Sequence, residues 1–333
     1  MEKANFPANI IKIDNVRIID YICKLDMKGK MSLGAKMLWG LLRLLGRLPL
    51  SFHHRWGRRL GRFLGKRLRY RREVVLTNLG RCFPDRNYDE ISAICNRFYE
   101  HFGTTLTEMI WFGACRGDKG RERLHKSRIV ELVNPEELNR LYGGARQLMI
   151  LQAHTGNWEL IGGIKHYSYT TPIDLTPDAF AVTYLHLASP LWDQVMRANR
   201  TAPVADQGFD GYVEASQVLR YALSRKTEKF GYAFITDQYP YSWGVPHPDV
   251  EFMHQQTPTM TAAAGLACKL DMAVAYLRFL CREDGGYRME IVPLSDHAAG
   301  ENPIALMQRY YKLLQEDLEK QPWNYLWTHK RWK

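Results

Sequence analysis

Several features that define common protein classes are missing from this 333-residue chain. Its six cysteines form no C-x-x-C pair and no Cys/His cluster with zinc spacing, so we expect free thiols in a reducing compartment and no structural metal. A transmembrane helix needs about 20 mostly apolar residues, and the longest apolar run in the basic N-terminal stretch lies only between Lys36 and Arg43. The first thirty residues carry scattered acidic residues and lack the apolar centre of a secretory signal. The sequence therefore predicts neither a membrane-spanning nor a secreted protein.

Acidic side chains are also missing from residues 31–72, which hold twelve Lys and Arg. The whole chain has 46 Lys plus Arg against 35 Asp plus Glu, a formal charge of +11, so the rest is close to neutral. The excess charge is thus local. With 46% hydrophobic and 24% charged residues, the chain is too apolar to be disordered and long enough for one large domain or two small ones.

The basic stretch predicts two amphipathic helices, over residues 35–48 and from Ser51 onward, separated by Pro49. Basic amphipathic helices suit an anionic membrane surface, where each basic residue contributes about 1 kcal/mol. A nucleic-acid-binding helix has no use for a continuous apolar stripe, so we expect no nucleic acid partner. Packing of the stripe on the rest of the protein or on another subunit stays open. The stripe comprises Leu38, Leu41, Leu42 and Leu45 in the first helix and Trp56, Leu60, Phe63 and Leu64 in the second.

The chain divides into three expected parts. Residues 1–30 form a polar leader, and we hypothesise that the true start is Met27 or Met31. Residues 31–72 are the membrane-docking helices, and residues 73–333 are the catalytic domain. In that domain, apolar segments of strand length alternate with helical patterns, which is typical of an α/β fold. We expect one domain with a central mixed sheet flanked by helices, with strands at 147–153, 180–185, 230–236, 272–280 and 287–293. The pattern also predicts a helix over 212–223, a break between helices at 82–85 and a hairpin turn at 284–286. Trp323, Tyr325 and Trp327 alternate as on a strand, where packing or a role in the site would explain them.

The segment His154-Thr-Gly-Asn-Trp-Glu159 follows the first of these strands and leads into a predicted helix. Residues five apart on one helix differ by about 140° in direction, but a chain reversal at residues 155–157 would let the Glu159 carboxylate reach the His154 imidazole. An acid that orients a general base is an arrangement used in acyl transfer. A structural histidine, and an acid placed in the first helical turn for the helix dipole, are the alternative interpretations.

A covalent acyl-enzyme is not expected, because the chain has no Gly-x-Ser-x-Gly elbow and no cysteine beside the motif. His154 would instead act directly on a substrate hydroxyl. Backbone N–H groups near Thr155, Gly156 and Asn157 would bind the substrate and stabilise the oxyanion, although Asn157 can equally serve only to shape the turn. An apolar groove beside the motif should hold an acyl chain.

The same block resembles the H-x4-D/E motif of glycerolipid-type acyltransferases, and in this form it resembles the bacterial lipid A biosynthesis acyltransferases. Other blocks agree in order, and the similarity covers roughly residues 31–333. These blocks are residues 75–84, Asp237-Gln238 after a strand, residues 250–259 and the closing residues 325–333.

The resemblance implies transfer of a fatty acyl chain from acyl carrier protein to a hydroxyl of a lipid A precursor. It implies a peripheral or monotopic enzyme at the cytoplasmic face of the bacterial inner membrane, with His154 as general base and Glu159 as its partner. This chemistry needs no metal and no organic cofactor.

Other site candidates carry two interpretations each. Asp237 and Gln238 either contribute to the site or form a turn. His329, Lys330 and Arg331 either bind the acceptor's phosphates or the acidic surface of the carrier protein, or form a solvated basic tail.

The chain departs from the family pattern at one position. The family usually has Arg or Lys just after the tyrosine of the strand at 180–185, where this chain has Leu185 and His186. Either His186, Arg197 or Arg200 supplies the cation for an oxyanion or phosphate, or the substrate differs. The same chemistry on another glycolipid or aminolipid therefore stays open, as does a non-catalytic protein that binds a membrane surface or nucleic acid.

Overall fold

The computed structural model describes residues 31–240 and 248–332, so the predicted leader over residues 1–30 lies outside the described residues. A seven-stranded sheet forms the centre, in the order β1-β9-β8-β2-β5-β3-β4. Its neighbours pair in parallel except β8 and β9, which form an antiparallel hairpin, and β6 pairs with β7 in a separate two-stranded sheet. The α/β fold with a central mixed sheet is confirmed. The strands are β1 (Val130–Leu132), β2 (Gln147–Gln152), β3 (Phe180–Tyr184), β4 (Tyr212–Glu214), β5 (Phe230–Ile235), β6 (Asp249–Phe252), β7 (Gln255–Pro258), β8 (Ala273–Cys281) and β9 (Tyr287–Ser295).

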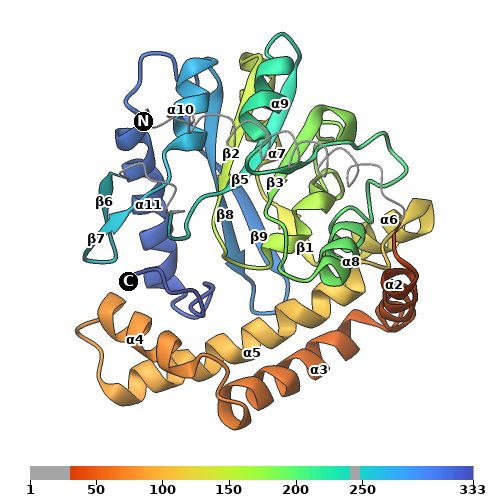
Figure 1. Ribbon diagram of the computed structural model, residues 1–333, viewed down its shortest axis with the longest axis vertical. Coiled ribbons are helices and arrows are strands. Elements are labelled where there is room, and N and C mark those ends of the chain that lie inside the picture. The colour runs from red at the N-terminus through yellow and green to blue at the C-terminus, as the bar shows by residue number, and fades with distance from the viewer. Residues whose placement is uncertain (1–30, 241–247, 333) are drawn as a thin grey trace, which may run out of the picture.

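Helices cover the sheet on both faces (Figure 1). Helices α10 and α11 lie on one side and α7 on the other, while α3, α4 and α5 cross beneath one end of the sheet. The α-helices are α2 (Leu33–Gly46), α3 (Leu50–Arg62), α4 (Arg72–Cys82), α5 (Tyr88–Phe112), α6 (Gly117–Ser127), α7 (Pro135–Gly144), α8 (Pro190–Arg200), α9 (Val218–Ser224), α10 (Ala262–Lys269) and α11 (Pro303–Lys320). The shorter turns are the π-helical η1 (Phe63–Arg67) and the 3-10 helices η2 (Trp158–His166) and η3 (Pro177–Ala179).

Strand β2 is buried along its whole length, which explains its continuous apolar sequence. Successive side chains of a strand point to opposite faces. Accordingly, Met149 and Leu151 belong to the core on one side of the sheet, and Leu148 and Ile150 to the core on the other. This rigid central strand carries the His154 segment directly after its last residue.

Most predicted elements are present with small shifts at their ends. The turn at residues 284–286 joins β8 to β9 as predicted, with Gly285 at φ +87°. The helix predicted over residues 212–223 is wrong in its first part, because Tyr212 and Val213 pair with β3 as an edge strand and only Val218–Ser224 is helical. Residues 323–327 form turns instead of the expected strand, and Trp327 is fully buried there.

The two basic N-terminal helices form, as α2 and α3, but they are not free of the domain. Glycine lets α3 approach α5 closely, since a Cβ atom on Gly57 or Gly61 would collide with the α5 backbone. Thr107 of α5 donates a hydrogen bond of 2.8 Å to the carbonyl of His53 in α3. Helix α3 thus packs on the catalytic domain through its glycine face and not through the apolar stripe, of which Trp56 and Phe63 stay exposed.

The opposite faces of these helices remain exposed. Within the described residues, no helix has the length and apolar character needed to cross a membrane. The five described cysteines form no disulfide.

Candidate active site

His154 and Asp237 meet at the carboxyl edge of two neighbouring strands. Gln152 at the end of β2 pairs with Ile235 at the end of β5, so the residues two positions further along each strand come together. His154 Nδ1 lies 2.8 Å and 3.1 Å from the two Asp237 oxygens, and the His154 backbone N–H donates to the same carboxylate at 3.2 Å. The carboxylate thus fixes both the ring and the backbone of His154.

Asp237 is only 1% exposed, and burial acts to raise its pKa. The neighbouring His154 ring and the hydrogen bonds that the carboxylate accepts outweigh this effect, and the net result is a pKa below the usual value. Asp237 is therefore ionised at neutral pH. An ionised carboxylate can only accept a hydrogen bond, so His154 carries its proton on Nδ1. The free lone pair of the ring is then on Nε2.

The sequence-based pairing of His154 with Glu159 is wrong in this structure. Glu159 lies in η2 and its carboxylate accepts hydrogen bonds from Arg200 of α8, through Nη2 at 2.6 Å and also through Nε. Arg200 also donates to the Tyr212 hydroxyl at 2.7 Å. The chain reversal occurs as expected, but the 3-10 turn and the Arg200 cation direct Glu159 elsewhere.

The second ring nitrogen of His154 contacts Gln238. The Gln238 side-chain nitrogen lies 3.2 Å from His154 Nε2, and the Trp158 ring packs edge-on to the imidazole at 5.0 Å between centroids. Gln238 therefore occupies the direction from which a substrate hydroxyl would approach the free lone pair.

Among the three cation candidates, only Arg200 contacts a residue of the His154 segment. His186, in the loop before α8, pairs with Asp193 in the first turn of that helix at 2.8 Å. Arg197 lies 5.6 Å from the centre of the Tyr212 ring, which itself stacks on Tyr184. Of the three candidates, Arg200 of α8 is therefore the one that lies beside Glu159.

The turn at residues 155–157 is held from both sides. Gly156 has φ +57°, a conformation that favours glycine, and its N–H donates to Asn324 Oδ1 at 2.6 Å. Its carbonyl accepts from His101 Nε2 at 3.1 Å. The expectation that the Gly156 N–H points at an oxyanion is wrong in this state, because Asn324 occupies that donor. The Thr155 side chain is also buried, at 1% exposure, as is that of Asn157. The turn therefore does not face solvent.

The C-terminal basic residues lie in different environments. Burial lowers the pKa of His329 to about 4, and its Nε2 accepts a hydrogen bond from the Tyr239 N–H at 3.1 Å, so the ring is neutral. Arg331 is 1% exposed and donates to the Pro258 carbonyl at 2.6 Å. The solvated-tail interpretation is therefore wrong for Arg331, while binding of the acceptor's phosphates or of the carrier protein stays a prediction. Lys330 alone is exposed.

Family-like blocks that are far apart in sequence pack together around this C-terminal segment. Asn78, from the first block, donates to the carbonyls of Trp327 and His329 at 2.9 Å and 2.8 Å. Trp332 donates to Thr257 of the third block at 2.9 Å. The C-terminal segment also reaches the motif directly, since the Leu326 N–H donates to the His154 carbonyl at 3.1 Å.

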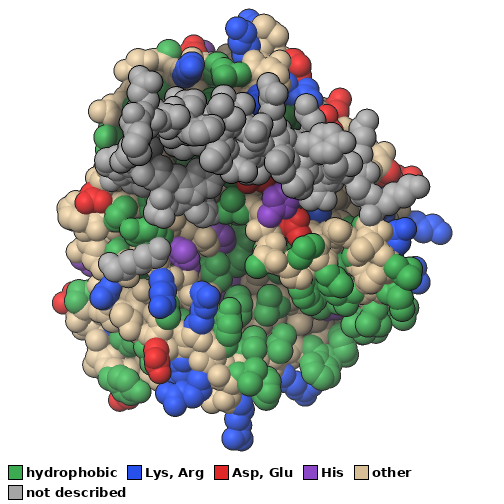
Figure 2. Space-filling view, viewed as in Figure 1, with side chains coloured by type: hydrophobic (Ala, Val, Ile, Leu, Met, Phe, Trp, Pro, Cys, Tyr) green, Lys and Arg blue, Asp and Glu red, His purple; other side chains and the backbone are tan. Residues whose placement is uncertain are grey.

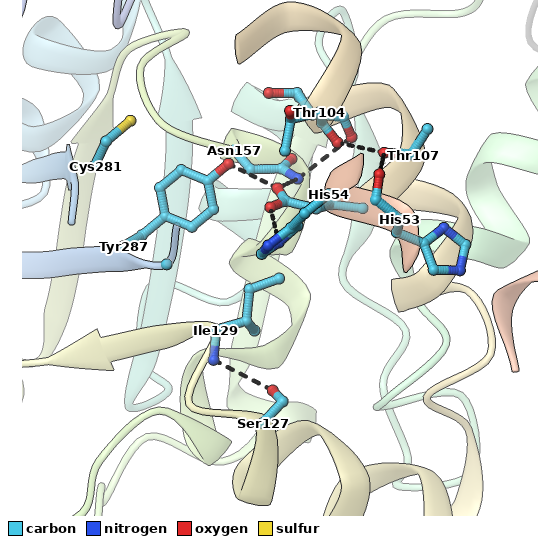
Figure 3. A network of polar contacts seen from close by, with 12 residues as sticks. His53, His54, Thr104, Thr107, Ser127, Ile129, Asn157, Cys281 and Tyr287 are labelled. Carbon is cyan, nitrogen blue, oxygen red and sulfur yellow. Dashed lines mark hydrogen bonds and ion pairs between the residues drawn. The ribbon is translucent and has the colours of Figure 1, made fainter. Parts of the chain in front are cut away.

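A buried carboxylate that the sequence motifs do not point to, Glu108 of α5, lies beside the motif. Asn157 donates to it at 2.9 Å, Tyr287 at 2.6 Å, and His54 Nε2 lies 2.8 Å away. Figure 3 shows the side chains of His54, Asn157 and Tyr287 converging there. The sequence does contain one signal for this site. Glu108 falls on the apolar helix face that also carries Ile91, Phe98 and Phe112, and a carboxylate buried there needs a hydrogen-bond donor or a cation as its partner. In the described residues no group of three or more His, Cys, Asp and Glu side chains is arranged to hold a metal.

Comparison with known proteins agrees with these observations. The family described as bacterial lipid A biosynthesis acyltransferase matches residues 28–205 and 232–333. The first segment contains His154, Glu159 and Arg200, and the second contains Asp237 and the C-terminal segment. A search among curated individual proteins finds no match. Because the matched segments make up well over half of the chain, this protein belongs to the bacterial lipid A biosynthesis acyltransferase family.

Proposed function

We propose that this protein transfers a fatty acyl group from acyl carrier protein to a hydroxyl of a lipid A precursor, with His154 as the general base. The observation that carries the proposal is the His154–Asp237 pair at the carboxyl edge of the sheet. The buried, ionised carboxylate holds Nδ1 and leaves the Nε2 lone pair available, which is what proton abstraction from a hydroxyl requires. An intact base with its own carboxylate favours an enzyme over a non-catalytic protein with the same fold.

The chemical steps balance without an acyl-enzyme. His154 Nε2 accepts the proton of the acceptor hydroxyl while that oxygen forms a bond to the thioester carbonyl carbon. The tetrahedral intermediate then expels the thiolate of the carrier, and the imidazolium returns its proton to the sulfur. Asp237 stabilises the imidazolium between the two proton transfers. Gln238 has to turn away from Nε2 before the acceptor binds.

Glu159 supports this chemistry through Arg200 instead of through His154. The Glu159 carboxylate and the Tyr212 hydroxyl hold the Arg200 guanidinium from two sides. Arg200 is the cation best placed to take the role that the family assigns to the residue after Tyr184, namely to balance negative charge on an oxyanion or a phosphate.

The test is acyl transfer to a lipid A disaccharide precursor from carrier protein charged with dodecanoyl, tetradecanoyl or hexadecanoyl chains. We expect His154→Ala to abolish transfer in a protein that still folds and unfolds cooperatively, although the loss of the Asp237 partner lowers the unfolding midpoint. His297→Ala is the matched control, since His297 is likewise paired with an aspartate, Asp271, but lies in the loop between β9 and α11. A near-wild-type rate for His154→Ala would refute the mechanism.

An alternative acceptor is favoured by one observation. Leu185 and His186 replace the expected cation after Tyr184, and His186 is already held by Asp193. The same acyl transfer to another glycolipid or to an aminolipid is therefore the second candidate. Lipid mass spectrometry of a deletion strain distinguishes the two, because it identifies which lipid loses an acyl chain.

We also propose that the protein docks on the cytoplasmic face of the inner membrane through α2, α3 and the start of α8. Figure 2 shows apolar side chains gathered over these helices, with basic side chains along the adjoining edge. An exposed apolar surface next to a basic one is typical of interfacial membrane binding. The large exposed apolar residues there are Leu33, Met37, Leu41, Leu44, Leu45, Trp56 and Phe63, joined by Leu185, Leu187, Leu191 and Trp192.

The membrane proposal is tested with the full chain, because removal of residues 31–72 would strip α3 from α5 and destabilise the fold. Leu41→Glu combined with Leu44→Glu should reduce sedimentation with vesicles of phosphatidylglycerol and phosphatidylethanolamine, with the unfolding midpoint unchanged. Leu219→Glu is the control, because Leu219 is similarly exposed but lies on α9. Equal vesicle binding by all three proteins would contradict docking through α2.

A further inference from the structure

Glu108 lies inside the protein and contacts three parts of the fold outside its own helix. It belongs to α5 and has no exposed surface. One carboxylate oxygen accepts hydrogen bonds from Asn157 at 2.9 Å and from Tyr287 of β9 at 2.6 Å. The other oxygen lies 2.8 Å from His54 Nε2 of α3. Figure 3 shows these contacts from close by.

The surroundings of Glu108 supply donors. Burial, and next the charge of Glu108, raise the pKa of Tyr287 well above its usual value, so the phenol keeps its proton and donates it. The Asn157 amide also presents its NH₂ group to the carboxylate. Loss of the negative charge would therefore weaken both hydrogen bonds, because a neutral oxygen is a poorer acceptor than a carboxylate oxygen.

Helix α5 holds the turn after His154 at two successive points. His101 donates to the Gly156 carbonyl, and Glu108, seven residues later on the same face of the helix, accepts from Asn157. Burial lowers the pKa of His101, so its ring is neutral and offers one N–H. The side chains of α5 thus fix the two residues that shape the chain reversal between His154 and Glu159.

We propose that Glu108 is a positioning residue for acyl transfer: it fixes Asn157, and through Asn157 the turn that presents His154 and Glu159. The inference rests on the proposed function for its effect on rate, but its effect on the turn is independent of that function. His54 connects the same carboxylate to α3, the helix that carries the exposed Trp56. Helix α3 and the turn at residues 155–157 therefore both contact the same buried carboxylate.

The experiment compares Glu108→Gln with Asp317→Asn in the full chain. Asp317 is a matched control, because it is equally buried, accepts from a tyrosine, Tyr276, at 2.9 Å and pairs with a cation, Arg278, at 2.7 Å. Two readouts are needed. The first is kcat and KM for the acyl carrier protein thioesters, measured below the unfolding midpoints of all variants. The second is backbone hydrogen exchange in peptides that cover residues 153–160.

For Glu108→Gln we expect kcat to fall by about ten- to a hundredfold, because small displacements of reacting groups cost rates of that order. KM should change less than twofold, and exchange in residues 153–160 should become faster. Both substitutions should lower the unfolding midpoint by similar amounts. Asp317→Asn should nevertheless leave kcat, and exchange in residues 153–160, unchanged. Addition of Glu108→Gln to Asn157→Ala should cause no further loss of kcat, because Glu108 acts through Asn157.

Three outcomes would overturn the proposal. One is unchanged exchange in residues 153–160, another is an unchanged kcat, and the third is a loss of kcat as large in Asp317→Asn as in Glu108→Gln. If the wild-type protein transfers no acyl group, the proposed function has failed, and the exchange measurement alone decides whether Glu108 holds the turn.

Discussion

The prediction most closely tied to the site geometry concerns Asp237→Asn. The substitution keeps the shape of the side chain and removes its charge. An asparagine that keeps its place beside Nδ1 can donate an N–H to that nitrogen, which moves the imidazole proton to Nε2. His154 would then lack the lone pair that accepts the hydroxyl proton, and no carboxylate would stabilise the imidazolium.

The magnitude follows from the distances. The carboxylate oxygens lie 2.8 Å and 3.1 Å from Nδ1, and Asp237 is nearly fully buried. With the charge centres about 4 Å apart and an effective dielectric constant of about 20, the attraction is about 4 kcal/mol. Since about 1.4 kcal/mol corresponds to a tenfold change in rate, kcat should fall about a thousandfold.

The assay is acyl transfer from charged carrier protein at saturating acceptor, with kcat and KM determined separately. The loss should appear in kcat, because the imidazolium forms only during the reaction. Glu159→Gln provides the comparison, since its carboxylate does not contact His154. If Asp237→Asn retained more than a tenth of the wild-type kcat while Glu159→Gln lost a thousandfold, Glu159 and not Asp237 would be the partner of the base.

Three further predictions concern stability. Glu159→Gln should lower the free energy of unfolding by about 3 kcal/mol, because it leaves Arg200 without its buried partner, and a double-mutant cycle with Arg200→Met should show strong coupling. Gly156→Ala should cost about 3 kcal/mol in urea unfolding, since φ is +57° and a Cβ would lie 2.8 Å from the Phe279 ring, whereas Gly143→Ala, which has open space, should cost nothing comparable. For His329, with a folded pKa of about 4, the unfolded chain takes up a proton as the pH falls below about 6.5 and the folded chain does not, so stability declines towards pH 4. His329→Gln should make that decline shallower, and an unchanged slope would contradict the neutral ring.

The sequence predicts elements well where one local pattern decides them. The fully apolar β2, the Asp284-Gly285-Gly286 turn and the break between α4 and α5 all carry their own signals. The apolar pattern of residues 212–214 continues into α9 and so predicts a helix. Only their pairing with β3 makes these residues an edge strand. The close contact at Gly57 and Gly61 has no signal in the apolar pattern, because these glycines act by letting another backbone approach and not by burying a side chain.

The site shows the same limit in a sharper form. Spacing along the chain made Glu159 the natural partner of His154, because both stand in one short block. The actual partner is 83 residues away and is selected by the register of two parallel strands, Gln152 opposite Ile235. A register between strands distant in sequence is not encoded in either strand alone. Asp237 could be identified as a polar residue at a strand end, but its contact with His154 required the sheet order.

This exchange of partners gives the carboxylates separate tasks. Glu159 is bound to a cation and Asp237 to an imidazole, and both are buried, so neither can substitute for the other without leaving a charge unpaired. This chain has Leu185 and His186 after Tyr184, where the family pattern has a cation. Arg200 instead approaches the motif from α8. Each carboxylate therefore positions one basic side chain: Glu159 holds Arg200, and Asp237 holds His154.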